Sequence, residues 1–174
     1  MRRSRRFVLV VLLAGGGVLA WALFRPELLW VDARVNESAP ETVSSMATGA
    51  AMPAVAGVLA TGRFHGVAHE SAGTATIHRL VDGRRVLRFT DFHTSNGPDV
   101  RVYLVAARDA SDSASVTRAA FVEIGELKGN IGDQNYELPA SVDLERYRAV
   151  TIWCKRFSVN FATAPLAPTP RATS

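Results

Sequence analysis

An uncharged apolar run near the N-terminus is the feature that most limits what this chain can become. Residues 7–24 (FVLVVLLAGGGVLAWALF) carry no charge. At about 1.5 Å rise per residue, a helix of this length spans roughly 27 Å, close to the hydrocarbon thickness of a bilayer. Four arginines lie within residues 1–6, and such positive charge marks the cytoplasmic side of a membrane segment. The sequence therefore predicts one N-terminal transmembrane helix, with its N-terminus in the cytoplasm and the C-terminal part outside it.

A cleaved signal peptide is the competing interpretation of the same run. Ala20 and Ala22 loosely supply the small residues of a cleavage site. The bulky Trp21 between them and the length of the run favour an uncleaved, single-pass anchor in the cell membrane. Both interpretations place the rest of the chain outside the cytoplasm.

The net charge of +4 comes from the N-terminal arginines. The other 16 Lys and Arg residues are matched by 16 Asp and Glu residues, so the exported part is electrically balanced. A nucleic-acid-binding protein would instead carry a basic surface on its folded domain. We therefore expect no nucleic acid partner. The hydrophobic fraction of 48% excludes a chain that is disordered throughout.

The exported part divides by composition into three segments. Residues 25–61 contain Pro40 and Pro53 and end in an Ala/Gly-rich stretch, which predicts a juxtamembrane linker. Residues 62–166 alternate short apolar runs with turn residues. Residues 167–174 are rich in Pro and Thr, which predicts a disordered tail.

Short runs with strand chemistry follow one another through residues 62–166. The Asp82-Gly83 pair between two such runs is a strong hairpin signal. We find no amphipathic helical pattern between the runs, which favours an all-β fold, an antiparallel β-sandwich or barrel. The predicted strands cover residues 74–80, 85–92, 100–105, 121–124, 134–138, 149–154 and 157–161.

Cys154 is the only cysteine of the chain. A lone cysteine outside the cytoplasm cannot form an intrachain disulfide, so it is a buried thiol, a ligand, a redox group or an intermolecular partner. Val150, Ile152 and Cys154 share one face of a predicted strand, which favours packing in the core. The competing interpretation is a thiolate tuned by the positive charges of Lys155 or Arg156.

The remaining polar residues give weaker signals. His69 and Cys154 are candidate haem or metal ligands if the fold brings them together, although a structural or surface role is the default for each histidine. Acidic residues beside Gly and Asn, such as Asp99 and Asp133, are typical of turns. Residues 94–99 and 129–135 are predicted loops, which either shape a site near Cys154 or serve only as turns.

Five collinear segments resemble the DM-thirteen domain family, an extracytoplasmic electron-transfer module. These segments are GRFHGVAHESAGTATI at 62–77, VLRFTDF at 86–92, TSNGPDVRVYL at 94–104, LKGNIGDQNYELP at 127–139 and VTIWCKRFSVNF at 150–161. The VNE at 35–37 is similar to the juxtamembrane segment of bacterial members with one anchor. The resemblance implies that Cys154 is the functional residue, either as a bare redox thiol or as a ligand of a group such as haem.

The sequence thus predicts a membrane-anchored domain with an electron-transfer or thiol-redox role centred on Cys154 and an unidentified redox or surface partner. Two alternatives remain at this stage. One is a cell-surface binding or adhesion module in which Cys154 belongs to the core. The other is a haem- or metal-binding domain that uses Cys154 and His69.

Overall fold

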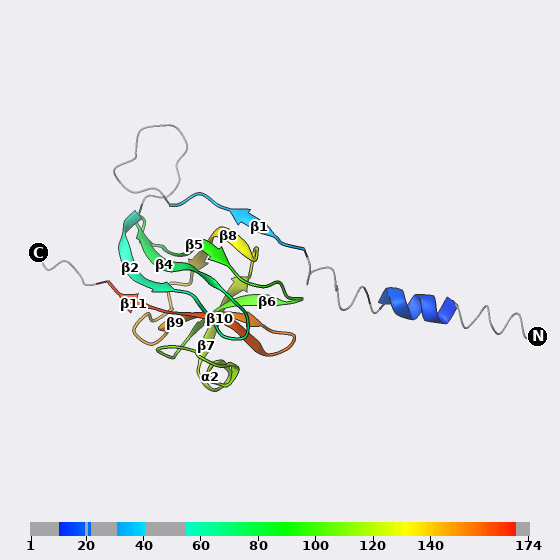
Figure 1. Cartoon of the computed structure of the whole chain (residues 1–174). Helices are drawn as coiled ribbons and strands as arrows, with labels where there is room; N and C mark the ends of the chain where they lie inside the picture. The colour runs from blue at the N-terminus through cyan, green and yellow to red at the C-terminus, as the bar shows by residue number, and fades with distance from the viewer. Residues whose placement is uncertain (1–10, 20, 22–30, 41–54, 170–174) are drawn as a thin grey trace, which may run out of the picture.

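The computed structural model describes residues 11–19, 21, 31–40 and 55–169. Residues 11–19 are helical (Figure 1). Within the described part of the chain, no helix combines the length and the apolar character that crossing a bilayer requires. The predicted basic segment 1–6 lies outside the described residues, and the predicted transmembrane segment 7–24 lies partly outside them.

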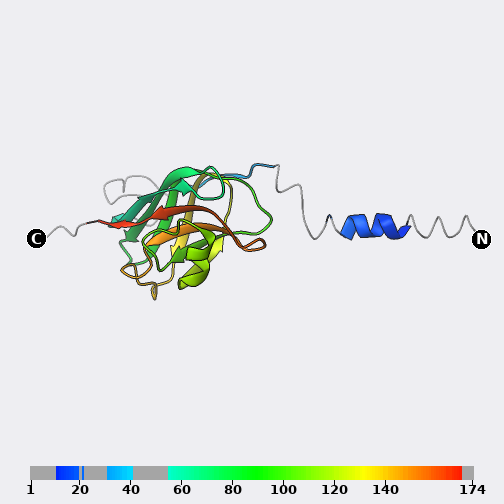
Figure 2. The ribbon, with the colours of Figure 1, turned by 60° about the horizontal axis from the view of Figure 1, so that its bottom comes forward.

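Two β-sheets pack face to face (Figures 1 and 2). The first contains, in spatial order, β1 (Arg34–Asn36), β8 (Ile131–Leu138), β5 (Arg85–His93), β4 (Ala72–Leu80), β2 (Val55–Arg63) and β11 (Ala167–Pro168). The second contains β3 (His65–Gly66), β10 (Val159–Pro165), β9 (Ala149–Cys154), β6 (Val100–Val105) and β7 (Phe121–Glu126). The strand pairs are antiparallel except for β1 with β8. The predicted antiparallel β-sandwich is confirmed.

The β4–β5 hairpin forms where the sequence predicts it. Gly83 has φ +86°, a conformation that glycine adopts without steric cost. The Leu80 N–H donates to the Arg84 carbonyl oxygen at 2.8 Å and closes the turn. Ile77 and Leu87 lie opposite each other on the two strands and are fully buried. The hairpin therefore fixes the register of the first sheet.

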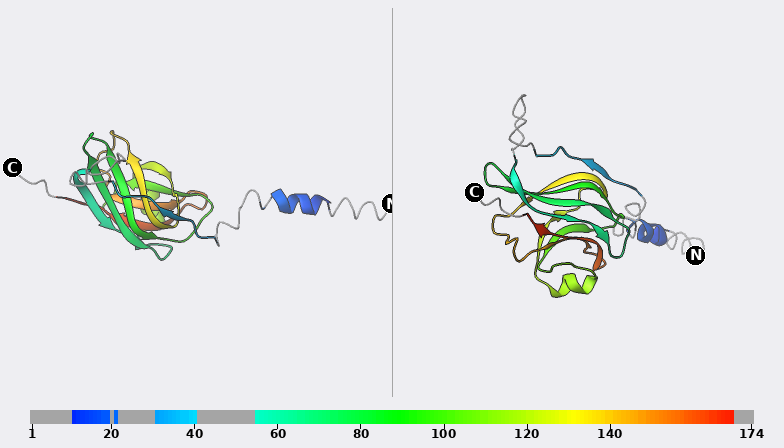
Figure 3. Two further views of the ribbon diagram at one scale, coloured as in Figure 1. Left: turned by 90° about the horizontal axis from the view of Figure 1, so that it is seen from above. Right: turned by 60° about the vertical axis from the view of Figure 1, so that its left-hand side comes forward.

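The main core lies between the two sheets. Alternating residues of each sheet point inward, as the period of a strand requires. They include Ile77, Leu87, Phe89, Val102, Leu104, Val150, Ile152 and Cys154. A smaller cluster lies on the outer face of the second sheet, where Tyr103 and Trp153 pack with Val116 of the short helix α2 (Ser113–Arg118). Figure 3 shows α2 on the side of the second sheet that faces away from the first.

The sheets extend beyond the domain boundaries predicted from the sequence. β1 and most of β2 fall in the predicted linker 25–61, and β11 falls in the predicted tail 167–174. β2 has the sequence VAGVLATGR, whose Ala and Gly content disfavours strands when judged locally. It is a strand because it pairs along β4, so tertiary context overrides local propensity. Residues 41–54 and 170–174 lie outside the described residues.

Candidate functional site

Cys154 ends the central strand of the second sheet. It pairs with Val100 of β6 on one side and with Val159 of β10 on the other. The Cys154 side chain has 0% exposure and lies in the main core together with Val150 and Ile152. The sequence-based expectation that these three residues share a core face is confirmed.

Lys155, the cationic residue directly after Cys154, pairs with a carboxylate on the surface. Lys155 Nζ donates to Glu123 Oε2 at 3.2 Å, on the surface of the second sheet. Activated cysteines lie in partly exposed, electropositive surroundings. Cys154 lies in an apolar, fully buried one. The interpretation that Lys155 tunes a thiolate therefore has no geometric support.

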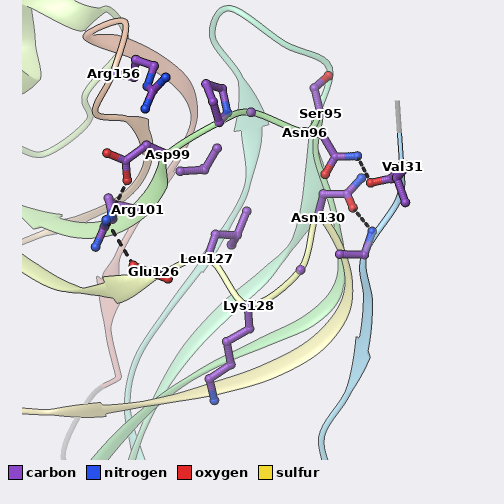
Figure 4. A pocket seen from close by; sticks show the side chains of 15 residues that line it. Val31, Ser95, Asn96, Asp99, Arg101, Glu126, Leu127, Lys128, Asn130 and Arg156 are labelled. Atoms are coloured by element: carbon purple, nitrogen blue, oxygen red, sulfur yellow. Dashed lines mark hydrogen bonds and ion pairs between the residues drawn. The ribbon is translucent and has the colours of Figure 1, made fainter. Parts of the chain in front are cut away.

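A pocket of about 420 Å³ opens at the end of the sandwich where β9 ends (Figure 4). Residues 95–99, residues 126–130 and Arg156 line it, together with Val31 and Ala33 from the far N-terminal side. Both predicted loops thus bound one site. Four segments that are distant in the sequence meet here.

Val100 separates this pocket from the cysteine. It lines the pocket and is also the register partner of Cys154. The Lys155 N–H donates to the Asp99 carbonyl oxygen at 2.8 Å, which joins residues 94–99 to the strand end. A Cβ on Gly97 would lie 2.8 Å from Val100 Cγ2, so any larger residue there would push the Val100 side chain aside. The cysteine therefore lies one residue behind the pocket wall.

The charges around the pocket are largely paired with one another. Arg101 Nε donates to Asp99 Oδ1 at 2.5 Å, and Arg101 also forms ion pairs with Glu123 and Glu126 at 3.2 Å. The hydrogen bond to Asp99 raises the pKa of Arg101, and the neighbouring carboxylates raise it further. The pocket wall is thus polar, and the three carboxylates around Arg101 outnumber its single positive charge.

We call residues 31–38 the docked segment. It contacts the predicted loops 94–99 and 129–135, which we call the motif loops, and its strand β1 forms the edge of the first sheet. Asn96 Nδ2 donates to the Val31 carbonyl oxygen at 2.7 Å (Figure 4). The Ala33 N–H donates to Asn130 Oδ1 at 2.7 Å, and Asn130 Nδ2 donates to Asp32 Oδ1 at 2.9 Å. Asn96 and Asn130 therefore bind the docked segment through its backbone and through the side chain of Asp32.

The C-terminal half of the docked segment is held by charge. Lys128 Nζ donates to Glu37 Oε1 at 2.7 Å, and the Asn135 N–H donates to Glu37 Oε2 at 2.6 Å. Arg88 donates to the Glu37 carbonyl oxygen at 3.1 Å. Arg88 is itself held by Asp133 at 2.5 Å, so a buried guanidinium links the docked segment to β8.

Two glycines make room for the docked segment. Gly132 has φ +101°, and a Cβ there would collide with the Val35 carbonyl oxygen. A Cβ on Gly129 would collide with the Ala33 carbonyl oxygen. The sequence KGNIGDQN at 128–135 is thus built to accept an extended strand at close range, a role that sequence reasoning missed.

A comparison with protein families shows to which family this chain belongs. A family model described as "Electron transfer DM13" matches residues 63–166. The chain belongs to the DM13 family. No curated protein and no solved structure matches the chain. Residues 95–101, 126–135 and Arg156, which bound the pocket and hold the docked segment, fall inside the DM13 match together with β9, whereas Val31 and Ala33 precede it.

His65 and His69 contact residues other than Cys154. The His69 ring packs against the Phe161 ring with centroids 4.0 Å apart, and His65 lies 3.2 Å from Asp109 on the surface. Burial, with the charge of Arg88, lowers the pKa of His78. Among the residues that the structure describes, no three His, Cys, Asp or Glu side chains are grouped as metal ligands are.

The surroundings of Cys154 do not fit a haem. Its side chain is closed in between the two sheets, next to Val100 and Val159, and it does not line the pocket. His69 faces an aromatic ring of the core. Cys154 and His69 as a ligand pair stay a prediction, which this packing does not favour.

Glu37 makes the docked segment sensitive to acid. Burial raises the pKa of its carboxyl, but the hydrogen bonds from Lys128 and Asn135 and the charges of Lys128 and Arg88 outweigh burial, so the pKa lies below its ordinary 4.5. Ionised Glu37 therefore stabilises docking above pH 4.5, and this contribution is lost as the pH falls through the lower pKa of the docked carboxyl. We expect the NMR shift of the Asn135 amide proton to titrate with a midpoint below 4.5.

The control for this titration is Glu37→Gln, which keeps the shape of the side chain and removes the charge. We expect the Asn135 amide to show no step in that variant. A midpoint at or above 4.5 in the native DM13 domain would show that the contacts of Lys128, Asn135 and Arg88 do not outweigh the effect of burial.

Proposed function

We propose that this chain is a membrane-anchored electron-transfer domain that works outside the cytoplasm, with Cys154 as its redox group. The observation that carries the proposal is the position of Cys154. The only cysteine of a DM13 domain ends the central strand directly behind a pocket whose walls are the family-matched loops. Support for the anchor comes from the uncharged segment 7–24 and the arginines before it.

The burial of Cys154 restricts the chemistry. Thiol–disulfide exchange requires a thiolate to attack a sulfur in contact with it. With 0% exposure, Cys154 cannot meet a sulfur of another protein unless residues 94–99 move. An electron needs no such contact, since it crosses a side chain such as Val100 without a bond being formed. Electron exchange through the pocket wall is therefore the form of redox chemistry that fits this geometry: the thiol gives one electron to an oxidised partner and its proton to solvent, which leaves a thiyl radical, and re-reduction reverses both transfers.

A surface binding or adhesion module is the second candidate. The closed packing of Cys154 favours it, because a buried cysteine packed against Val150 and Ile152 is also typical of a residue with a purely structural role in the core. The two functions differ in one respect. Only the first requires that the domain give up an electron and take it back.

Protein purified from its own membrane tests the proposal. We expect it to exchange electrons with a soluble redox mediator in protein-film voltammetry while showing no visible absorption band. A haem-type band would assign the redox role to a bound group instead of the thiol. Absence of any mediator-dependent current would overturn the proposal in favour of the binding module.

A further inference from the structure

The docked segment enters the domain at the end that carries the pocket. β1 runs parallel to β8, and Arg34 pairs with Ile131, the first residue of β8. β8 begins directly after the motif residues 127–130. Val31 is bound there by Asn96. The chain therefore reaches the sandwich beside the pocket, and it then runs along the first sheet away from it.

Strand directions divide the sandwich into two ends. β5 runs from Arg85 to His93, so residues 94–99 lie at one end and the 81–84 turn lies at the other, about 30 Å away by strand rise. Cys154 pairs with Val100, so the 155–158 turn shares the end of residues 94–99. Figures 1 and 2 show the β9–β10 turn at the same end as the start of the docked segment.

The connection to the proposed anchor is short. Six residues, 25–30, separate the apolar segment from Val31. Seven steps of an extended chain span at most about 24 Å. With the proposed anchor, the site at which the docked segment meets Asn96 therefore lies within that distance of the membrane surface. The tether sets no such limit on the 81–84 turn at the other end of the strands.

We infer that the docked segment is a clamp that turns the pocket end of the DM13 domain, with Cys154 behind it, toward the membrane surface. The inference rests on the proposed anchor. Without the clamp, the tether would extend to Val55, where β2 begins, and residues 25–54 would leave the domain free to rotate. With the clamp, the contacts of Asn96, Asn130 and Lys128 shorten the tether to residues 25–30 and attach it at the pocket end.

The consequence concerns the partner of the domain. A pocket held toward lipid headgroups, within about 24 Å of them, meets components that reside in the membrane. A protein diffusing freely outside the membrane approaches the opposite end of the sandwich. The clamp therefore assigns the pocket to exchange with a membrane-resident redox component.

Two exposed residues allow a matched test of this orientation. Phe157, in the turn after Cys154, is 59% exposed, and Val81, in the β4–β5 turn, is 61% exposed. Phe157→Cys and Val81→Cys are each labelled with a fluorophore in the full chain, which is then reconstituted in vesicles with nitroxide on the lipid headgroups. The unmutated chain gives the labelling background, since Cys154 is buried.

We expect quenching at position 157 to exceed that at position 81 by about twofold or more. Gly132→Ala, which prevents docking, should make the two positions equal, and Gly125→Ala, where a Cβ meets nothing within 4 Å, should leave the difference intact. Equal quenching in a chain that floats with the vesicles overturns the clamp and leaves the anchor standing. A chain that fails to float overturns the anchor and the orientation with it.

Discussion

Gly132→Ala is expected to release the docked segment without unfolding the sandwich. A side chain at φ +101° is strained, and its Cβ would collide with the backbone of Val35. Strain of this kind costs about 1–3 kcal/mol before the collision is counted. β1 is an edge strand of three residues that pairs only with β8 among the described strands. Detachment of β1 removes the collision with Val35 at the lowest cost in stability, because no residue of β1 belongs to the core between the sheets.

Amide hydrogen exchange measures this release. We expect the amides of Ala33 and Glu37, which donate to Asn130 Oδ1 and to the Asp133 carbonyl oxygen, to exchange roughly 10- to 100-fold faster in Gly132→Ala, while those of β4 and β9 change little. Gly125→Ala is the matched control, because it also adds one methyl group to a strand glycine but into open space. Unchanged protection of the Ala33 and Glu37 amides in Gly132→Ala would show that the docked segment does not depend on the close approach at Gly132.

The central strands were predictable from the sequence because their signals are local. Asp82 and Gly83 predict the turn of the β4–β5 hairpin, and the apolar run before Cys154 predicts β9. α2 was missed because six residues are too few to display a helical period. β2 was missed because its Ala and Gly residues form a strand only in the presence of β4.

The site was predictable only in part. The position of Cys154 in the core follows from the alternation along β9, and the structure confirms it. The docked segment left no such signal, because Asn130 and Ala33 are 97 residues apart and their complementarity is not a periodic pattern. Gly129, Gly132 and the asparagines of the same loops are ordinary turn residues when judged locally. Their second role emerges only once the fold brings residues 31–38 beside them.

Removing the thiol of Cys154 is expected to destroy electron exchange while leaving the fold intact. Cys154→Ala deletes one fully buried sulfur, and the cavity should lower the free energy of unfolding by about 1–2 kcal/mol. Cys154→Ser changes the side-chain volume less than Cys154→Ala does, but it buries a hydroxyl. This costs about 1–3 kcal/mol of stability where the hydroxyl finds no hydrogen-bond partner. Denaturant unfolding measures both. In the native protein, a thiol reagent should modify Cys154 only as the domain unfolds.

A matched control separates loss of the thiol from loss of stability. Val150 is also 0% exposed and lies on the same face of β9. Val150→Ala is expected to destabilise the sandwich by a similar or larger amount, about 1–3 kcal/mol, while retaining the cysteine. Its electron exchange should match that of the native chain at temperatures where both are folded.

Electron exchange of Cys154→Ala, measured beside Val150→Ala and the native chain in protein-film voltammetry, tests the role of Cys154 most directly. The account predicts a mediator-dependent current in the native chain and in Val150→Ala, and its loss in folded Cys154→Ala. A current of native size in folded Cys154→Ala would contradict the account, because the buried thiol would then be only a part of the core.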